Sequence, residues 1–426
     1  MKKIIFFITC AITLLVLPSC TLENIKGSPG LDSALIDVAI TLPEAYTEYG
    51  LEGYTVEFRN TNFGFRYLKQ TNSQGKVNQE LEFGSYTIMV RGEIVTPSGK
   101  ALVNGQAPIV FNAEYNNTSP LTIHTSVNLL SPLIFSEIYF TNSLWANGTT
   151  GYTRDRYFVV HNNTPEVQYL DGVGFGTHIS YNSNALNRWV KEDDITPRDS
   201  IPHSWAFIIP GSGTDHPLLP GEDAIFAFSA VDHTAVAGAG PLFVNLAREN
   251  VWALYNGEAP GATTGHDPPQ FPANLAFLYF AGAGNQVTLS ISSPALFIYK
   301  LEGLSPTLDT YEKVALDYVK DGPVAGKDGG RVQYSLPNLT ATPVVKIPKE
   351  WVLDGIEIYR GDPFYKRFPA TVETGRAVGP VQYSGISLVR KINETLTAEY
   401  GFTVYQDTNN SEEDWIEVEA PTLLWP

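Results

Sequence analysis

Short apolar runs separated by turn residues are the feature that most constrains how this chain can fold. Runs of about four to eight residues rich in Val, Ile, Tyr, Phe and Thr recur along the sequence, and 36 Gly and 29 Pro separate them. β-branched and aromatic residues favour strands, whereas Gly and Pro favour the turns that end strands. The pattern therefore predicts an all-β protein with little helix. In residues 157–160, Tyr157 and Val159 would point to one face of a strand and Phe158 and Val160 to the other, so we expect this strand to be buried on both faces.

One segment has a helical pattern instead. In residues 308–319 the apolar side chains recur every three or four positions, at Leu308, Tyr311, Val314, Ala315 and Tyr318. This spacing predicts a short amphipathic helix. We expect it to be a local addition to the β-structure.

The first 20 residues have the pattern of a secretory signal. Lys2 and Lys3 precede an apolar run over residues 4–17 that is too short to stay in a bilayer as a membrane span. The following Leu-Pro-Ser-Cys resembles a bacterial lipobox, which implies a signal peptide over residues 1–19, cleavage before Cys20 and acylation of Cys20. Several acyl chains on one residue give durable anchoring without a membrane span. Thr21 in place of Asp predicts the outer membrane and leaves the choice of leaflet open.

The composition limits the partners of the mature chain. Both cysteines lie in the first 20 residues, so the mature protein would have no thiol catalysis and no disulfide. Cleavage removes Lys2 and Lys3 from the 28 basic residues, and the 45 acidic residues then give a formal net charge of −19. This charge argues against nucleic acid and anionic membrane surfaces as partners.

The mature length predicts two or three domains. Residues 20–33 read as a lipidated tether, and Asp32-Ser33-Ala34 resembles the O-glycosylation acceptor of Bacteroidota, which makes Ser33 a candidate modification site. Residues 34–128 read as strands; the stretch TNSQGKVNQELEFGSYTIMVRG resembles prealbumin-like or carboxypeptidase-regulatory-like β-sandwich modules. That resemblance implies a β-sandwich that serves as a stalk.

Residues 132–426 form the second expected domain, and most of residues 132–420 carry a second resemblance. Its segments are FSEIY at 135–139, DRYFVVHNN at 155–163, WVLDGIE at 351–357, KR at 366–367, VRK at 389–391 and DTNNS at 407–411. Together they resemble an uncharacterised family of Bacteroides-type lipoproteins of about 400 residues, and more distantly the lamin-tail immunoglobulin-like β-sandwich. The resemblance implies a larger sandwich with long loop insertions and an envelope location. It implies no catalytic residue.

Candidate chemistry is sparse. The chain has no Gly-x-Ser-x-Gly elbow, His-Glu-x-x-His helix or phosphate-binding loop, and we expect no cofactor. The middle of the chain holds His203, His216, His233 and His266, of which His216 and His233 are candidate metal ligands beside aspartates. Their spacing fits no tight ligand motif. An exported metal-assisted hydrolase is therefore the alternative function.

The leading prediction is a non-enzymatic envelope lipoprotein that binds a glycan, a protein or a component of an uptake complex. Aromatic side chains in loop-rich segments can stack on such partners or can fill the core beneath the loops. Four tryptophans leave both possibilities open: Trp145, Trp189, Trp205 and Trp252.

The segment QDTNNSEEDW, residues 406–415, holds the densest group of carboxylates near the end of the chain. Its alternating oxygen-bearing residues, Asp407, Asn409, Ser411 and Glu413, resemble the first half of a calcium loop. Such a loop needs Gly at the sixth position and Glu at the twelfth, where this chain has Glu412 and Val418. We therefore predict a structural turn before a closing strand that starts at Trp415.

Overall fold

The computed structural model describes residues 32–61, 63, 65–96, 99–115, 119–129, 131–191, 195–203, 205–255, 268–271, 276–280, 289–301, 312–319, 331–335 and 343–424. The predicted signal peptide, the lipidation site Cys20 and the loop residue His266 lie outside these residues. Ser33 lies inside them.

Strands dominate the described residues, as predicted. The α-helices among them are short: α1 (Glu394–Tyr400) and α2 (Ser411–Asp414). The 3-10 turns are η1 (Glu44–Tyr49), η2 (His233–Ala235), η4 (Lys349–Trp351) and η5 (Thr422–Leu424). The all-β prediction is confirmed.

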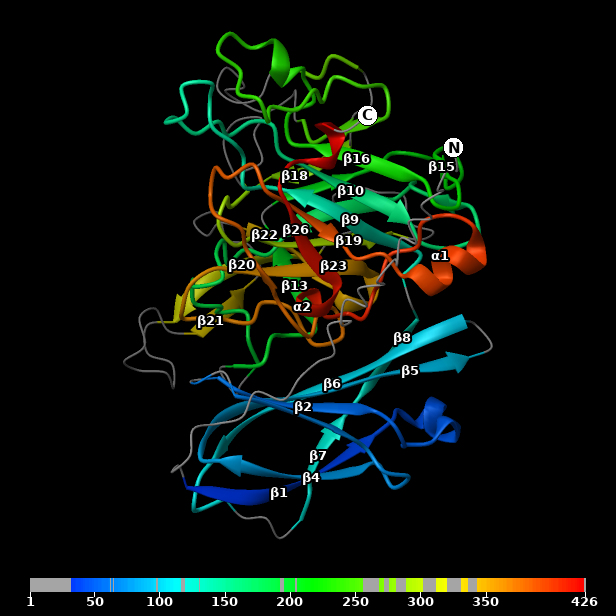
Figure 1. Ribbon diagram of the computed structural model, residues 1–426, viewed down its shortest axis with the longest axis vertical. Helices are drawn as coiled ribbons and strands as arrows, with labels where there is room; N and C mark the ends of the chain where they lie inside the picture. Colours follow the sequence, from blue (N-terminus) through cyan, green and yellow to red (C-terminus); the bar gives the residue numbers. More distant parts are fainter. Residues whose placement is uncertain are drawn as a thin grey trace, which may run out of the picture. The chain divides into compact units, whose positions relative to one another are not determined.

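The chain divides into two compact units (Figure 1). The N-terminal unit takes the described parts of Met1–Thr41, Gly50–Arg91 and Gln106–His124, and the C-terminal unit takes Leu42–Tyr49, Gly92–Gly105 and Thr125–Pro426. One three-stranded sheet has the order β4 (Lys76–Glu82), β1 (Ser33–Thr41) and β7 (Leu121–His124). A five-stranded sheet has the order β3 (Arg66–Gln70), β2 (Thr55–Asn60), β5 (Gly84–Thr96), β6 (Gly99–Phe111) and β8 (Ser126–Leu129).

The strands of the N-terminal unit bury alternate residues. In β1, Ile36, Val38 and Ile40 are buried, whereas Leu35 between Ala34 and Ile36 is half exposed. Successive side chains of a strand point to opposite faces, so one face of β1 packs on the core and the other faces out.

The C-terminal unit contains two six-stranded sheets. The first has the order β17 (Val251–Ala253), β16 (Asp223–Ala227), β10 (Tyr157–Asn162), β9 (Leu133–Tyr139), β25 (Ser387–Arg390) and β26 (Trp415–Val418). The second has the order β18 (Ala276–Phe280), β14 (Trp205–Ile208), β12 (Val173–Thr177), β19 (Ala295–Lys300), β23 (Val352–Tyr359) and β24 (Ala377–Val378).

Smaller sheets complete the unit. One pairs β11 (Gln168–Tyr169) with β15 (Pro217–Leu218), and the other has the order β13 (Ser200–His203), β22 (Pro343–Pro348), β20 (Glu312–Val319) and β21 (Arg331–Ser335).

The main core lies between the two six-stranded sheets. Phe135 and Phe158 of the first sheet pack in one cluster with Phe175 of the second, and the rings of Phe158 and Phe175 stack at 4.0 Å. Tyr157 and Val159 belong to another cluster on the opposite face of β10. The sequence prediction that strand 157–160 is buried on both faces is therefore confirmed.

The predicted helix over residues 308–319 is wrong for residues 312–319, and residues 308–311 lie outside the described part of the chain. Residues 312–319 form β20, which pairs antiparallel with β21 and β22. The same stretch also fits a strand, because Val314, Leu316 and Tyr318 alternate at period two. Pairing on both sides of β20 outweighs the weak local helical preference.

Candidate functional site

The C-terminal segment 406–415 folds as a turn followed by one helical turn and a strand. Asn409 has a positive φ of 56°, and the side chain of Asn410 accepts a hydrogen bond from the backbone N–H of Glu412 and caps α2. Asp414 ends this helix, and Trp415 begins β26, which pairs with β25. The predicted closing strand is confirmed.

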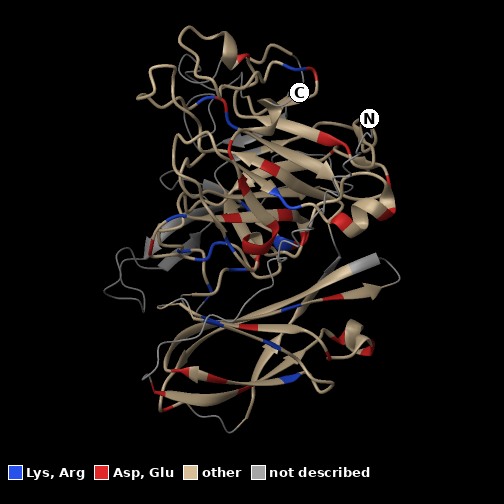
Figure 2. Cartoon of the chain, viewed as in Figure 1, with Lys and Arg blue, Asp and Glu red and all other residues tan. Residues whose placement is uncertain are grey.

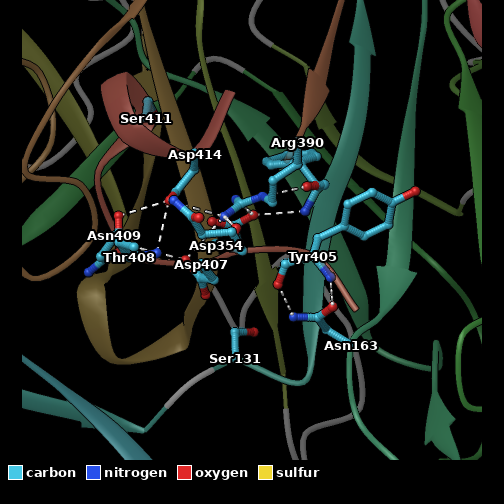
Figure 3. A network of polar contacts seen from close by, with 12 residues as sticks. Ser131, Asn163, Asp354, Arg390, Tyr405, Asp407, Thr408, Asn409, Ser411 and Asp414 are labelled. Carbon is cyan, nitrogen blue, oxygen red and sulfur yellow. Dashed lines mark hydrogen bonds and ion pairs between the residues drawn. The ribbon is translucent and has the colours of Figure 1, made fainter. Parts of the chain in front are cut away.

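Arg390 of β25 lies at the centre of the network that holds this segment (Figure 3). Its guanidinium donates to the carboxylate of Asp354 at 2.6 Å and to that of Asp407 at 3.1 Å. Its Nε donates to the carbonyl oxygen of Phe135 at 2.8 Å, and a carboxylate oxygen of Asp414 lies 3.5 Å from Nη1. Three aspartates from distant parts of the sequence thus surround one buried arginine.

The network carries more negative than positive charge. Burial raises the pKa of Asp354 to about 6 and that of Asp414 to about 7, although the guanidinium of Arg390 opposes both shifts. Burial would lower the pKa of Arg390, but the three carboxylates raise it above the ordinary arginine value. The aspartates therefore keep Arg390 protonated, and the positive guanidinium lowers the free-energy cost of burying their carboxylates.

Backbone and side-chain donors complete the network. Asp414 accepts hydrogen bonds from the backbone N–H and the hydroxyl of Thr408, at 2.9 and 2.8 Å. Glu373 accepts from the backbone N–H of Ser411 at 3.0 Å and from the Ser411 hydroxyl, and burial raises the pKa of Glu373 to about 8. The side chains or backbone of Asp407, Ser411 and Asp414 therefore form hydrogen bonds with other residues of the chain.

Two further buried acids of the resemblance segments have structural partners. Glu137 accepts from the hydroxyl groups of Tyr157 and Ser387, both at 2.7 Å. Glu357 accepts from the backbone N–H of Phe368 at 2.8 Å and lies 2.9 Å from Nζ of Lys366. The charged residues of these segments thus tie separate strands of one fold together.

The loop histidines contact different partners. The ring nitrogens of His233 lie 2.5 Å from the hydroxyl of Tyr152 and 2.9 Å from the carbonyl oxygen of Ser229, so both nitrogens are engaged. The ring of His216 packs edge-on against Trp252, and its backbone N–H donates to Asp171. His203 is fully buried, and burial lowers its pKa to about 3.

A metal centre is not assembled from the described residues. Within the ranges given above, no three His, Cys, Asp or Glu side chains come together in a position to hold a metal ion. The carboxylate of Asp407 faces Arg390, and Asn409 donates to the carbonyl oxygen of Thr371. The side chain of Glu413 is half-buried on α2, and its backbone carbonyl accepts a hydrogen bond from Lys391.

The remaining candidates are the four tryptophans of the loop-rich segments and the modification candidate Ser33. Trp189 is buried, and its indole N–H donates to the carbonyl of Ser200 at 2.7 Å. Trp145 and Trp252 are half-buried against other aromatic rings, and the side chain of Trp205 lies outside the described part of the structure. Ser33 is the exposed first residue of β1, and its hydroxyl donates to Glu80 at 2.8 Å.

Sequence reasoning missed an exposed surface at the edge strand β24, which we call the arginine–aromatic patch (Tyr359, Phe364, Arg376, Val378 and Val381). The guanidinium carbon of Arg376 lies 4.1 Å from the ring centroid of Tyr359 and 4.4 Å from that of Phe364. Val378 is 63% exposed and Val381 is 61% exposed. No sequence motif marks this surface, because its residues meet only when β23 pairs with β24.

Acidic residues, whose charge is opposite to that of Arg376 in the patch, predominate in the rest of the chain. Asp and Glu recur along both units in Figure 2, including on α1 and α2. The patch therefore places an arginine and several apolar groups on a protein whose formal net charge is −17. No helix of the described residues is long and apolar enough to cross a membrane.

Comparisons with known proteins give a family match and a shared fold. Residues 219–422 match the model of a family described as protein of unknown function (DUF4876). The fold is similar to the crystal structure of a DUF4876 family protein from Bacteroides thetaiotaomicron VPI-5482, with 24% identity and a TM-score of 0.51 over 90% of this chain and 94% of that chain. No curated protein matches the chain. The all-β architecture is therefore one that a Bacteroides protein also has.

Proposed function

We propose that this protein is a non-enzymatic binding module of the cell envelope that a lipid anchors in the outer membrane. The lipobox-like sequence that ends at Cys20 supports the anchor. The single observation that carries the binding role is the arginine–aromatic patch, whose two valines are more than 60% exposed beside a stacked arginine.

The use of polar groups in the fold favours binding over catalysis. Catalytic acids and bases must face a substrate. Here Asp354 and Asp407 face Arg390, and both ring nitrogens of His233 bond to neighbouring residues. A metal-assisted hydrolase built on His216 and His233 is therefore less well supported.

The patch suits a protein partner. Interface cores are enriched in Tyr, Phe and Arg and depleted of acidic residues, and hot spots gather where rings and arginines are desolvated. The patch has the aromatic rings and the arginine, with the exposed Asp362 bonded to the Tyr359 hydroxyl at 2.9 Å beside it. The planar guanidinium of Arg376 already packs over both rings, so little side-chain freedom is lost on binding. We propose an envelope protein as the partner; a glycan is the second candidate.

Co-isolation from detergent-solubilised envelopes tests this function. The double variant Val378→Ser/Val381→Ser removes apolar contact at exposed positions and should leave the melting temperature unchanged. The control is Ile416→Ser, at a residue that is 46% exposed on β26. We expect the double variant alone to lose a partner that co-isolates with the unmodified protein. Equal recovery with all three proteins would count against the patch, and glycan-array binding that depends on Val378 and Val381 would replace the protein partner with a sugar.

A further inference from the structure

The hairpin between β2 and β3 presents aromatic rings to solvent. Phe63 is 63% exposed, and its ring stacks on that of Phe65 with centroids 5.6 Å apart. The side chain of Asn60 accepts a hydrogen bond from the backbone N–H of Phe63 at 2.9 Å, and the backbone N–H of Asn60 donates to the carbonyl of Phe65 at 2.8 Å. Ordered hydrogen bonds thus hold an apolar side chain in water.

The chain enters the N-terminal unit at the same end. The backbone N–H of Phe83 donates to the carbonyl of Asp32, the first described residue, at 2.8 Å. Two residues later, the carbonyl of Ser85 accepts from the backbone N–H of Thr61, next to the hairpin tip, at 2.9 Å. The entry point and the tip therefore both flank the start of β5.

A third apolar side chain, that of Val110, lies at the same end, next to Phe111. The ring of Phe111, the last residue of β6, lies 5.7 Å from that of Phe83. The preceding residue, Val110, is 68% exposed. We call Phe63, Phe65 and Val110 the apolar tip.

The proposed lipid limits how far this end can move from a bilayer. Asp32 follows Cys20 by 12 positions, and a chain of that length reaches at most about 40 Å. One acylated residue fixes only a point, whereas a second apolar contact adds affinity and restricts rotation. Aromatic side chains favour the headgroup region, where an apolar ring meets the edge of the acyl chains.

We propose that the apolar tip inserts into the surface of the membrane that holds the Cys20 lipid. This inference rests on the proposed lipid anchor. The contact is hydrophobic and needs no anionic lipid, which agrees with the formal net charge of −19 that cleavage before Cys20 leaves on the chain. It makes the N-terminal unit a membrane-oriented base rather than a stalk that swings freely on its tether.

A single fluorescent label tests the insertion. Both native cysteines lie at positions 10 and 20, so Phe63→Cys gives the mature lipoprotein one site for a polarity-sensitive fluorophore. The matched control is Val95→Cys, because Val95 is 72% exposed and lies near the other end of β5, about 35 Å along the strand from its start. The lipidated proteins are reconstituted into phosphatidylcholine vesicles with and without nitroxide-labelled lipid.

We expect the label at position 63 to shift to shorter wavelength and to lose most of its fluorescence to the nitroxide, while the label at 95 keeps its emission. Unquenched label at 63 on protein that floats with the vesicles would refute insertion and leave the lipid anchor intact. Protein that fails to float would refute the anchor and this inference together. Shielding at 63 that requires an added envelope protein would assign the tip to a protein partner and also refute insertion.

Discussion

Replacing Arg390 with methionine should destabilise the C-terminal unit strongly. The substitution keeps most of the side-chain length but removes four hydrogen bonds, which go to Phe135, Asp354, Gln406 and Asp407. Removing one partner of a buried ion pair costs about 3–5 kcal/mol, because the remaining charge stays buried without compensation. A loss of that size is a large part of a total stability of about 5–15 kcal/mol.

The loss should depend on pH. At pH 8 the aspartates of the network must be buried as anions without the arginine, whereas at pH 5 they can take up protons and become neutral. The pKa values of Asp354 and Asp414 are already raised to about 6 and about 7 with Arg390 present. Arg390→Met should therefore lower the unfolding free energy more at pH 8 than at pH 5.

Chemical and thermal unfolding at the two pH values measure this effect. We expect the melting temperature to fall by roughly 10 °C at pH 8. The control is Arg248→Met, at a partly buried arginine that donates to the carbonyls of Asn245 and Leu423. Its loss should be smaller and equal at both pH values. A loss below about 1 kcal/mol for Arg390→Met, or the same loss at pH 5 and pH 8, would refute the role given to the network.

The remaining predictions concern the whole protein. Because burial raises the folded-state pKa of Asp414 and Glu373 to about 7 and about 8, the folded state holds protons that the unfolded state has released; thermal melts should show stability falling as pH rises from about 6.5 to 8, a window in which the buried His203, whose pKa is lowered to about 3, is neutral in both states, and a rise in that window would contradict it. Truncation after Val404 removes β26, Trp415 and two of the three aspartates around Arg390, namely Asp407 and Asp414, so we expect a large fall in melting temperature; an unchanged value would mean that this segment does not close the sheet. Millimolar calcium should leave the melting temperature within a degree or so, because Asp407 is bonded to Arg390; a shift of several degrees that Asp407→Ala abolishes would restore the calcium site. Calorimetric titration with zinc should give no saturable heat that His216→Ala/His233→Ala removes, since both ring nitrogens of His233 are engaged.

The strands could be predicted from local sequence because alternation and turn residues act over short distances. Residues 157–160 and Trp415 illustrate this success, since each lies in a strand where the pattern placed one. Residues 312–319 illustrate the limit, because their spacing fits either a helix or a strand and partner strands decide between them.

The buried charged residues could have been recognised in the sequence as single charges inside apolar runs, a pattern not used in the predictions above. Glu137, Asp354 and Arg390 each interrupt an apolar run, and a lone charge in a buried strand needs a partner. The identity of the partner could not be read, because Ser387 bonds to Glu137 across 250 positions. The arginine–aromatic patch was equally hidden, since it forms where two short segments pair.

The lipid anchor at Cys20 is best tested by the mass and location of the mature N-terminus. Both the proposed function and the membrane contact of the apolar tip depend on a lipid at Cys20. Mass spectrometry of protein from the membrane fraction should find a chain that begins at Cys20 and carries fatty acids, and Cys20→Ala should prevent lipid attachment and release the protein from that fraction. Membrane retention of the variant with its first 19 residues still attached, together with no lipid on the unmodified protein, would show that the N-terminal apolar run anchors the chain and that Cys20 does not.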